Sequence, residues 1–145
     1  MLLKLIAIGK LKDKYFRERI DEYAKWISPY AKLEIRELQD SSPDKEANAI
    51  LKELEKDKGA LIVAMAEEGQ QYASRQFAEI LDKAGKKVVF IIGGPLGLAD
   101  IVKQKADKKL SLSKMTFTHE FARLILMEQL FRAVNILNGG HYHKD

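Results

Sequence analysis

The sequence predicts an α/β domain whose mostly parallel sheet is covered by helices on both faces. Short apolar segments alternate with longer amphipathic segments along the whole chain, which is the order expected of repeated strand and helix units. Segments 60–66 (ALIVAMA) and 88–92 (VVFII) are apolar without interruption, as strands buried on both faces are. No linker or internal repeat divides the chain, so we expect a single domain over residues 1–145.

The first half of the chain supplies two strand and helix units. Segment 2–8 (LLKLIAI) is strand-like, and the apolar stripe of the segment after it predicts a helix that ends before Pro29. Segment 32–38 (KLEIREL) alternates apolar and charged residues, as a half-buried strand does. A second helix is expected to begin at Ser42, with proline next to it, and to close at Gly59.

The second half continues the alternation. A helix follows strand 60–66, with Ser74 as its N-cap and Gly85 as its stop. Three further elements follow strand 88–92: a helix from about Leu98 to Lys108, a short strand from Leu110 to Ser113, and a long helix from about His119 to Leu137.

Composition narrows the classes of protein. The chain has no cysteine, which excludes disulfides, thiolate metal sites and cysteine nucleophiles and fits a reducing compartment. No apolar run approaches the ~18 residues of a membrane span, and the apolar start stops at Ile8 without a cleavage site, so we expect a cytoplasmic protein with no membrane partner. The net charge of +4 has the sign expected of a protein that meets phosphate, but acidic residues interleave with the basic residues of segment 10–19, as on a solvated helix face.

A glycine-rich turn, Gly93 to Gly97 (GGPLG), follows strand 88–92 at the position where α/β proteins bind ligands. Its order differs from G-x-G-x-x-G, no Lys followed by Ser or Thr comes after it, and Pro95 removes one backbone amide. A triphosphate or a dinucleotide pyrophosphate therefore fits poorly. Two interpretations stay open: a tight turn without a ligand, and a loop that lets the backbone approach a flat uncharged group such as an adenine edge.

The last helix, expected over 119–137, is apolar on more than one stripe and needs two partners. We expect one to be its own sheet and the other to be the same helix of a second subunit in a homodimer. Glu128 and Arg132 have the i,i+4 order of a modest surface pair. Arg123, between apolar neighbours, is a candidate for a buried or a substrate-facing role.

The chain ends in His141, Tyr142, His143 and Lys144, before Asp145. Such a tail is either a frayed terminus or a set of side chains able to bind an unstacked base and its phosphate. The two histidines have no third ligand near them in the sequence, so no metal site is expected.

Three stretches, FIIGGPLGL, LSLSKMTFTHEFARLILMEQLFRA and the terminal YHK, resemble the ribosomal RNA large subunit methyltransferase H family. That family belongs to the SPOUT class of S-adenosylmethionine-dependent RNA methyltransferases, and the likeness covers nearly the whole chain. The resemblance implies a sheet whose C-terminal part is tied in a trefoil knot, and a homodimer with cofactor sites near its interface. Hydrophobic patterning alone indicates no knot.

The resemblance also implies a set of residues that bind S-adenosylmethionine, in three loops. They are Met65, Gly93, Leu112, Ser113, Lys114, Met115, Thr116 and Phe117. The chain departs from the family at three positions: Met65 replaces a leucine, and Thr118 and His141 each replace a proline.

The implied reaction is methylation at N3 of a pseudouridine in 23S ribosomal RNA, in a stem-loop of the assembled ribosome. The imide proton must leave, and His143 is the first candidate for a general base, with Tyr142 stacking on or orienting the base. Arg123, Arg132 and Lys144 are expected to hold phosphate or carbonyl oxygens, although both arginines fit ion pairs of the core or of the dimer equally well. His119 is expected to be structural or a neighbour of the pocket.

Two other functions stay open from the sequence. A non-catalytic module that binds RNA or the ribosome would also be small and basic, but it has no need of a glycine turn together with a hydroxyl-rich loop. An α/β domain that binds another nucleotide fits the order of elements, but the phosphate-binding patterns are missing.

Overall fold

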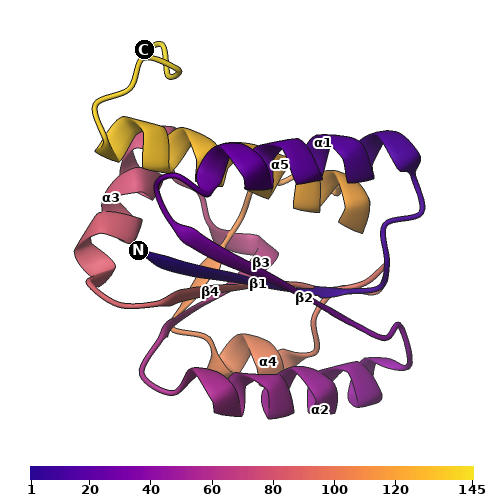
Figure 1. Ribbon diagram of the computed structural model, residues 1–145. Coiled ribbons are helices and arrows are strands. Elements are labelled where there is room, and N and C mark those ends of the chain that lie inside the picture. Colours follow the sequence, from indigo (N-terminus) through magenta and orange to yellow (C-terminus); the bar gives the residue numbers. More distant parts are fainter.

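The computed structural model describes residues 1–145 and has three layers, with a sheet between two layers of helices (Figure 1). The sheet has five strands in the order β2-β1-β4-β3-β5, and every pair is parallel. The strands are β1 (Leu2–Ile8), β2 (Lys32–Leu38), β3 (Leu61–Gln70), β4 (Val88–Ile92) and β5 (Lys108–Leu110). The predicted fold class is confirmed.

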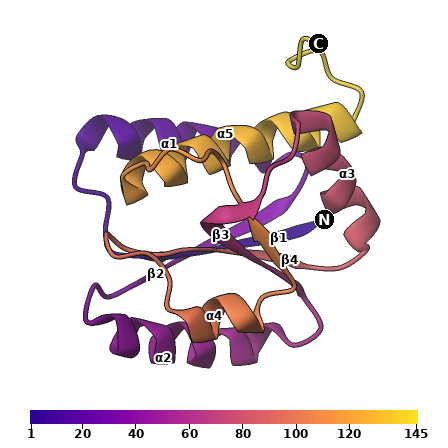
Figure 2. The same ribbon diagram turned by 180° about the vertical axis from the view of Figure 1, so that it is seen from behind.

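Helices cover both faces of the sheet, as the apolar central strands require (Figures 1 and 2). One face carries α1 (Lys14–Ile27), α3 (Ser74–Ala84) and α5 (His119–Leu137). The other carries α2 (Pro43–Leu54), the short 3₁₀ turn Glu55–Asp57 and α4 (Asp100–Lys105). The sheet therefore separates two cores: Leu3 and Leu5 of β1 pack under α1 and α5, whereas Ile6 and Ile8 pack under α2.

The predicted segment 98–108 differs from the structure in where helix becomes strand. Helix α4 ends at Lys105, and β5 begins at Lys108 rather than at Leu110. Asp107 explains the change, because its backbone N–H donates to Ile62 O at 2.8 Å and its carboxylate accepts from Ile62 N at 2.8 Å. The Asp107 N–H thus bonds to β3 and is not available for the hydrogen bond that a longer α4 would require.

Two smaller predictions were also wrong. The N-cap of α3 is Ala73, whose N–H donates to Gln76 Oε1, while the Ser74 hydroxyl donates to Gln129 Oε1 at 2.7 Å. Strand β3 continues past Ala66, the predicted end of the strand, as far as Gln70, with an irregular register against β5. Gly69 permits this, because a Cβ at that position would lie 2.6 Å from the backbone carbon of Lys109.

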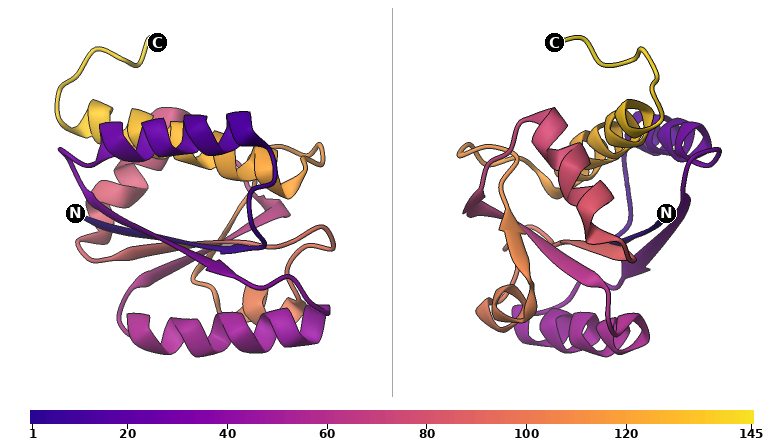
Figure 3. Two further views of the ribbon diagram at one scale, coloured as in Figure 1. Left: turned by 45° about the vertical axis from the view of Figure 1, so that its right-hand side comes forward. Right: turned by 90° about the vertical axis from the view of Figure 1, so that its left-hand side faces the viewer.

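Helix α5 has more neighbours within the chain than the sequence suggested. It packs between α1 and α3 and over the sheet, which buries Leu126, Met127, Leu130 and Val134 (Figure 3). Phe131, for example, lies 5.5 Å from Trp26 between ring centroids. Apolarity therefore does not by itself demand a second subunit, and the homodimer stays a prediction, as does the trefoil knot.

The amino ends of the strands are closed by a buried group of charges. Lys4 of β1 is 1% exposed, and its Nζ donates to Glu53 Oε2 and to Asp57 Oδ2, each at 2.7 Å. Lys87 binds Asp57 at 2.8 Å, and Lys56 binds Glu53 at 3.1 Å. We call these five residues the Lys4 cluster; it ties α2 and the turn after it to the start of β1 and β4.

No helix has the length and apolarity that crossing a membrane would take.

Candidate functional site

The topology creates a crevice at the carboxyl ends of β1 and β4. These strands are neighbours, but the chain leaves β1 for α1 on one face of the sheet and leaves β4 for α4 on the other. The two connections diverge, and such switch points are where parallel sheets bind ligands. The glycine turn lies there.

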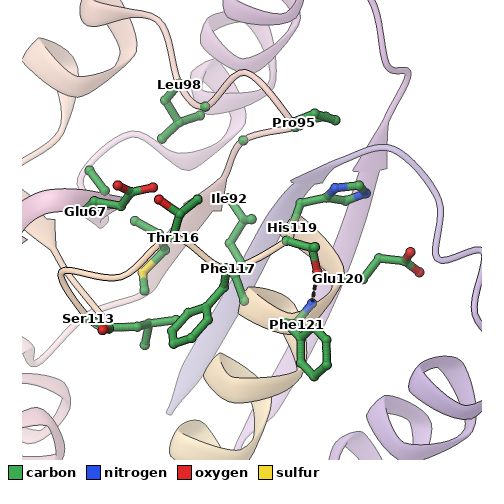
Figure 4. A pocket seen from close by; sticks show the side chains of 18 of the residues that line it. Glu67, Ile92, Pro95, Leu98, Ser113, Thr116, Phe117, His119, Glu120 and Phe121 are labelled. Carbon is green, nitrogen blue, oxygen red and sulfur yellow. Dashed lines mark hydrogen bonds between the residues drawn. The ribbon is translucent and has the colours of Figure 1, made fainter.

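A cavity of about 990 Å³ occupies this crevice. Five segments wall it: the start of α1, the end of β3, the turn after β4, Lys103 of α4, and the loop from Leu110 into α5. Figure 4 shows Glu67 and Thr116 on one side of the space, with His119 and Phe121 on the other. Pockets for ligands of drug size span about 300 to 1,000 Å³, so this one is at the upper end and has room beyond a single small molecule.

The glycine turn is compact because no side chain fits inside it. Gly97 N–H donates to Gly94 O at 2.9 Å, and Gly97 has a φ of +77°, which favours glycine. A Cβ on Gly93 would lie 2.7 Å from the backbone carbon of Gly97. The turn therefore presents bare backbone to the cavity.

The hydroxyl-rich loop after β5 is ordered by its own side chains. Ser111 Oγ donates to Ser113 O at 2.9 Å, and Ser113 Oγ accepts from Met115 N at 3.0 Å. Thr118 then caps α5, because its Oγ1 accepts from Phe121 N at 3.3 Å. These bonds order the loop along the wall of the cavity, which Ser113, Met115 and Thr118 also line.

Of the eight residues that the resemblance assigns to the cofactor, seven line this cavity. They are Met65, Gly93, Leu112, Ser113, Met115, Thr116 and Phe117. Lys114 is exposed and is not among the lining residues. The fold thus brings together three segments that lie far apart in the chain: strand β3, the glycine turn and the loop after β5.

Residues at the start of α1 complete the cavity, and the sequence reasoning missed them. Asp13 and Phe16 line it, and Asp13 also caps α1 through Tyr15 N and Phe16 N. Glu120 of α5 holds this segment in place, because its Oε1 accepts from Lys12 N at 2.8 Å and from Asp13 N at 3.2 Å. These residues could not be assigned to the site from the sequence, because no local pattern shows that β1 and β4 are neighbours. His119 also lines the cavity, which agrees with the expectation that it is a neighbour of the pocket.

Acidic side chains dominate the charge around the cavity. Glu68 binds Lys103 at 2.7 Å, and this hydrogen bond lowers the pKa of the Glu68 carboxyl. Glu67 beside it has no ion-pair partner. Behind the glycine turn, burial raises the pKa of Glu46, and the nearby Asp40 carboxyl raises it further. A cavity with these walls suits a cationic ligand better than a phosphate.

The four expected substrate-binding residues of the tail and of late α5 form a second group. Arg132 donates to Glu128 through Nε at 3.2 Å and Nη2 at 2.9 Å, confirming the i,i+4 pair. The Arg132 guanidinium lies 4.8 Å from the centroid of the Tyr142 ring, and the Tyr142 hydroxyl is 3.2 Å from Glu128 Oε2. Burial and the Glu128 charge raise the pKa of Tyr142 to about 12, so the phenol keeps its proton and donates to Glu128. Lys144 is exposed beyond them.

His143 is held by both of its ring nitrogens. Nδ1 lies 3.0 Å from Arg132 Nη1, and Nε2 lies 3.2 Å from Asp145 Oδ1. A guanidinium only donates, so Nδ1 accepts and the proton of a neutral ring is on Nε2. Within this chain the lone pair that a general base would use is occupied.

Arg123 is used inside the molecule. It is 1% exposed, and it donates to Glu37 Oε2 at 2.5 Å and to Gly9 O at 3.0 Å. Its position joins the first turns of α5 to the carboxyl ends of β1 and β2, behind the cavity. The structure thus places Arg123 in the buried role of the two that the sequence left open.

The cavity and the tail lie at opposite ends of α5. The cavity touches His119 to Ala122 in the first turn, while the tail leaves the helix after Leu137 (Figure 1). A helix of 19 residues is about 28 Å long at ~1.5 Å per residue. One chain therefore does not bring its own His143 to its own cavity in this conformation.

Comparison with known proteins decides the family. Residues 1–143 match the model of the family described as "Predicted SPOUT methyltransferase". This chain belongs to the SPOUT methyltransferase family. The resemblance indicated by the sequence is confirmed, and with it the enzyme class and the S-adenosylmethionine cofactor of that class.

Full-length relatives carry a more specific name. The chain is 43% identical over 161 residues to the ribosomal RNA large subunit methyltransferase H of Bacillus pumilus, covering 99% of this chain and 100% of that protein. It is 41% identical over 156 residues to the protein of the same name from Kosmotoga olearia, covering 99% of each chain.

Solved SPOUT structures share the fold at low sequence identity. A probable methylase family protein from Haemophilus influenzae aligns with a TM-score of 0.61 and 15% identity, over 99% of this chain and 70% of that one. The methyltransferase AviRb of Streptomyces viridochromogenes, solved in complex with the cofactor AdoMet, aligns with a TM-score of 0.53 and 12% identity, over 97% of this chain and 59% of that one.

Proposed function

We propose that this SPOUT protein methylates N3 of a pseudouridine in the RNA of the large ribosomal subunit, within the assembled ribosome. The observation that carries the proposal is the cavity at the switch point, which gathers residues of β3, of the glycine turn and of the loop after β5. The name shared by its full-length relatives supports the same reaction. A ribosomal substrate supports a location in the cytoplasm, with ribosomes.

The cavity residues fit S-adenosylmethionine. Bare backbone at Gly93 and apolar walls at Met65 and Leu112 suit an adenosine, and the unpaired Glu67 suits a cationic ligand. When bound, S-adenosylmethionine would supply the methyl group of its sulfonium to a ring nitrogen, with the neutral thioether as the leaving group. The chain contributes by holding the donor and excluding water from the crevice.

Proton removal falls to the tail. We assign His143 as the general base, Tyr142 as the residue that orients the target base, and Arg132 and Lys144 as contacts to RNA oxygens. Arg123 supports the site from behind through Gly9 and Glu37. No metal ion has a role in this scheme.

The distance along α5 has a consequence for assembly. Because about 28 Å of helix separates the cavity from the tail, the proposal requires the tail of a second copy to reach the cavity of the first. We therefore propose a homodimer whose sites each combine the cavity of one protomer with the tail of its partner. On reaching that cavity, His143 must also exchange Arg132 or Asp145 for substrate.

A mixing experiment tests this scheme. Calorimetry first establishes that the wild type binds S-adenosylmethionine and that turnover occurs on unmethylated ribosomes. His143→Ala should bind the donor normally without turnover, and Gly93→Val should lose the donor. When the two inactive variants are mixed and allowed to exchange subunits, one site of each mixed dimer is intact, and activity should return.

Each outcome has a meaning. No recovery in mixed dimers would contradict the shared site, and full turnover by His143→Ala would remove His143 from the mechanism. A folded wild type that binds ribosomes but no methyl donor would favour the non-catalytic RNA-binding module.

A further inference from the structure

We infer that Glu46, buried directly behind the glycine turn, makes the cavity bind cationic S-adenosylmethionine more tightly than S-adenosylhomocysteine, whose sulfur is neutral. The inference rests on the proposed placement of the cofactor in this cavity. It does not depend on which RNA receives the methyl group. Glu46 would thus be a specificity-determining residue that distinguishes the methyl donor from the product left after transfer.

The Glu46 carboxylate lies against the back of the glycine turn. The turn joins Ile92 to Leu98 along the cavity, and Gly94 is one of the lining residues (Figure 4). A Cβ built on Gly94 would lie 3.7 Å from each carboxylate oxygen of Glu46, which is ordinary contact. Glu46 itself does not line the cavity. Its charge therefore acts on the cavity through a single layer of backbone.

The carboxylate is fixed in place, but no cation balances it. Glu46 lies in the first turn of α2 and is 6% exposed. Its Oε2 accepts from Ser41 N at 2.8 Å, and it forms no ion pair. Burial raises the pKa of Glu46, the Ser41 N–H lowers it, and the neighbouring Asp40 carboxyl raises it again, so that the net shift is upward. The free protein therefore lacks the positive charge that would favour the ionised form.

The other charged residues on the elements around Glu46 are either exposed or already paired. Those exposed to solvent are Lys10 after β1, Asp44 and Lys45 of α2, and Asp100 of α4. Those in ion pairs are Glu37 of β2 with Arg123 of α5, and Lys103 of α4 with Glu68 of β3. A ligand in the adjacent cavity is thus the remaining source of a cation for this carboxylate.

A cationic ligand and ionised Glu46 should therefore stabilise each other. Water screens a buried carboxylate poorly, so a positive charge held in the cavity acts on Glu46 more strongly than on the exposed Glu67. A cation that lowers the pKa of Glu46 by about one unit binds about tenfold more tightly to the ionised form than to the protonated form. After methyl transfer the sulfur is a neutral thioether, and this gain is lost. The product should then dissociate more readily than the donor.

The test is a calorimetric comparison of S-adenosylmethionine with S-adenosylhomocysteine. Both ligands carry the same amino and carboxyl groups, so the ratio of their Kd values, product over donor, reports the charge on sulfur. The carboxyl of Glu46 is protonated below its pKa, which lies above the ordinary value of 4.5. In the wild type the ratio should rise about tenfold as the pH rises through that pKa. Buffers of different ionisation enthalpy should also show that binding of the donor releases protons.

Glu46→Gln removes the charge but keeps an oxygen that can accept from Ser41 N. Its ratio should stay low and nearly constant over the same pH range, without the release of protons. Asp44→Asn is the matched control, because it removes the same charge from an exposed position in the same turn of α2. It should keep the wild-type ratio at every pH. Asp40→Asn removes the carboxyl that raises the pKa of Glu46, so the rise should move to lower pH.

The outcomes separate this inference from the proposed function. A wild type that binds no donor, or a Gly93→Val variant that still binds it, contradicts the placement of the cofactor in the cavity. A ratio that follows the same pH dependence in Glu46→Gln as in the wild type overturns the role of Glu46 and leaves the cofactor site intact. An equal loss of both ligands in Glu46→Gln also overturns it, because the residue would then only hold the turn in shape. If Glu46→Gln does not fold, an unshifted pH profile in Asp40→Asn overturns the inference.

Discussion

The two ends of the sheet are built on opposite principles. At the carboxyl ends of β1 and β4 the chain uses glycine, bare backbone and an open cavity. At the amino ends it uses the Lys4 cluster, in which buried charges satisfy one another. The open end leaves groups free to meet ligands, and the closed end leaves none. The sheet can therefore carry an open site at the carboxyl ends of its strands, because the Lys4 cluster holds the layers together at the amino ends.

The titration of the Lys4 cluster follows from its geometry. Burial alone would raise the pKa of Glu53, but hydrogen bonds from Lys4 and Lys56 outweigh burial and lower it to about 2. Burial would likewise raise the pKa of Asp57, and Lys4 and Lys87 lower it. Burial would lower the pKa of Lys4, and its two carboxylate partners raise it. All three groups are therefore stabilised in their charged forms.

The largest expected effect is on stability, from Lys4→Met. The change leaves Glu53 and Asp57 buried with fewer partners, and removing one member of a buried ion pair costs about 3–5 kcal/mol. Denaturant unfolding should show this loss in the free energy of unfolding. The exposed control Lys58→Met should stay within about 0.5 kcal/mol of the wild type. Equal stability of both variants would mean that the closed end does not hold the layers.

Low pH should weaken the Lys4 cluster and lower the free energy of unfolding. Carboxyls whose pKa is lowered in the folded state contribute stability that is complete above their unfolded pKa and is lost as the pH falls through the folded value. For Glu53 that window runs from its ordinary value of 4.5 down to about 2. The free energy of unfolding should therefore fall progressively across this window. In Lys4→Met the fall should be smaller, and an identical pH dependence in both proteins would contradict the assignment.

Glycine substitutions sharpen the contrast between the two ends. Gly93→Val places a side chain against the backbone of Gly97. An overpacked site costs about 1–3 kcal/mol, and if the bound form of the turn carries this cost the Kd for S-adenosylmethionine should rise about 5- to 150-fold. Gly59→Ala, at the amino end, meets no atom within 4 Å but strains a φ of +84°. The control should lose about 1–2 kcal/mol of stability and keep the wild-type Kd. Equal binding by both variants would remove the glycine turn from the cofactor site.

The smallest effect is expected at the N-cap of α5. Thr118→Ala loses the hydrogen bond to Phe121 N and should cost about 1 kcal/mol. Thr118→Pro loses the same bond, but the φ of −61° at this position already suits proline. Proline also lowers the conformational entropy of the unfolded chain, which stabilises the folded protein by about 0.4–1 kcal/mol. The proline variant should therefore have a Tm close to that of the wild type. A proline variant less stable than the alanine variant would show that the loop needs the Thr118 N–H.

Particular residues show how far sequence patterns reach. Ser42 and Pro43 start α2 as expected, and Gly85 ends α3 with a φ of +59°. Local chemistry alone decides such positions. Ser74 was misassigned because Gln129, far along the chain, binds its hydroxyl. The helix expected to reach Lys108 stops early because Asp107 pairs with Ile62.

The residues of the site likewise fall into those that the sequence predicted and those that only the fold brings there. The glycine turn and the hydroxyl-rich loop were predicted, and the fold brings six of their assigned residues together with Met65 to one cavity. Asp13, Phe16 and Glu67 were not predicted, since only strand order places them there. The tail residues were assigned to the same site, yet α5 carries them to the far end of the molecule.

The sequence by itself determined the alternation of strands and helices, the buried central strands and the family, because these depend on local periodicity and on motifs that neighbouring residues spell out. Only the tertiary structure decided which segments share the cavity and that the tail lies apart from it. It also decided that Arg123 is buried and donates its hydrogen bonds to Glu37 and Gly9. The physical reason is that strand order and helix packing arise from contacts between distant segments, and no local pattern encodes the distance between them.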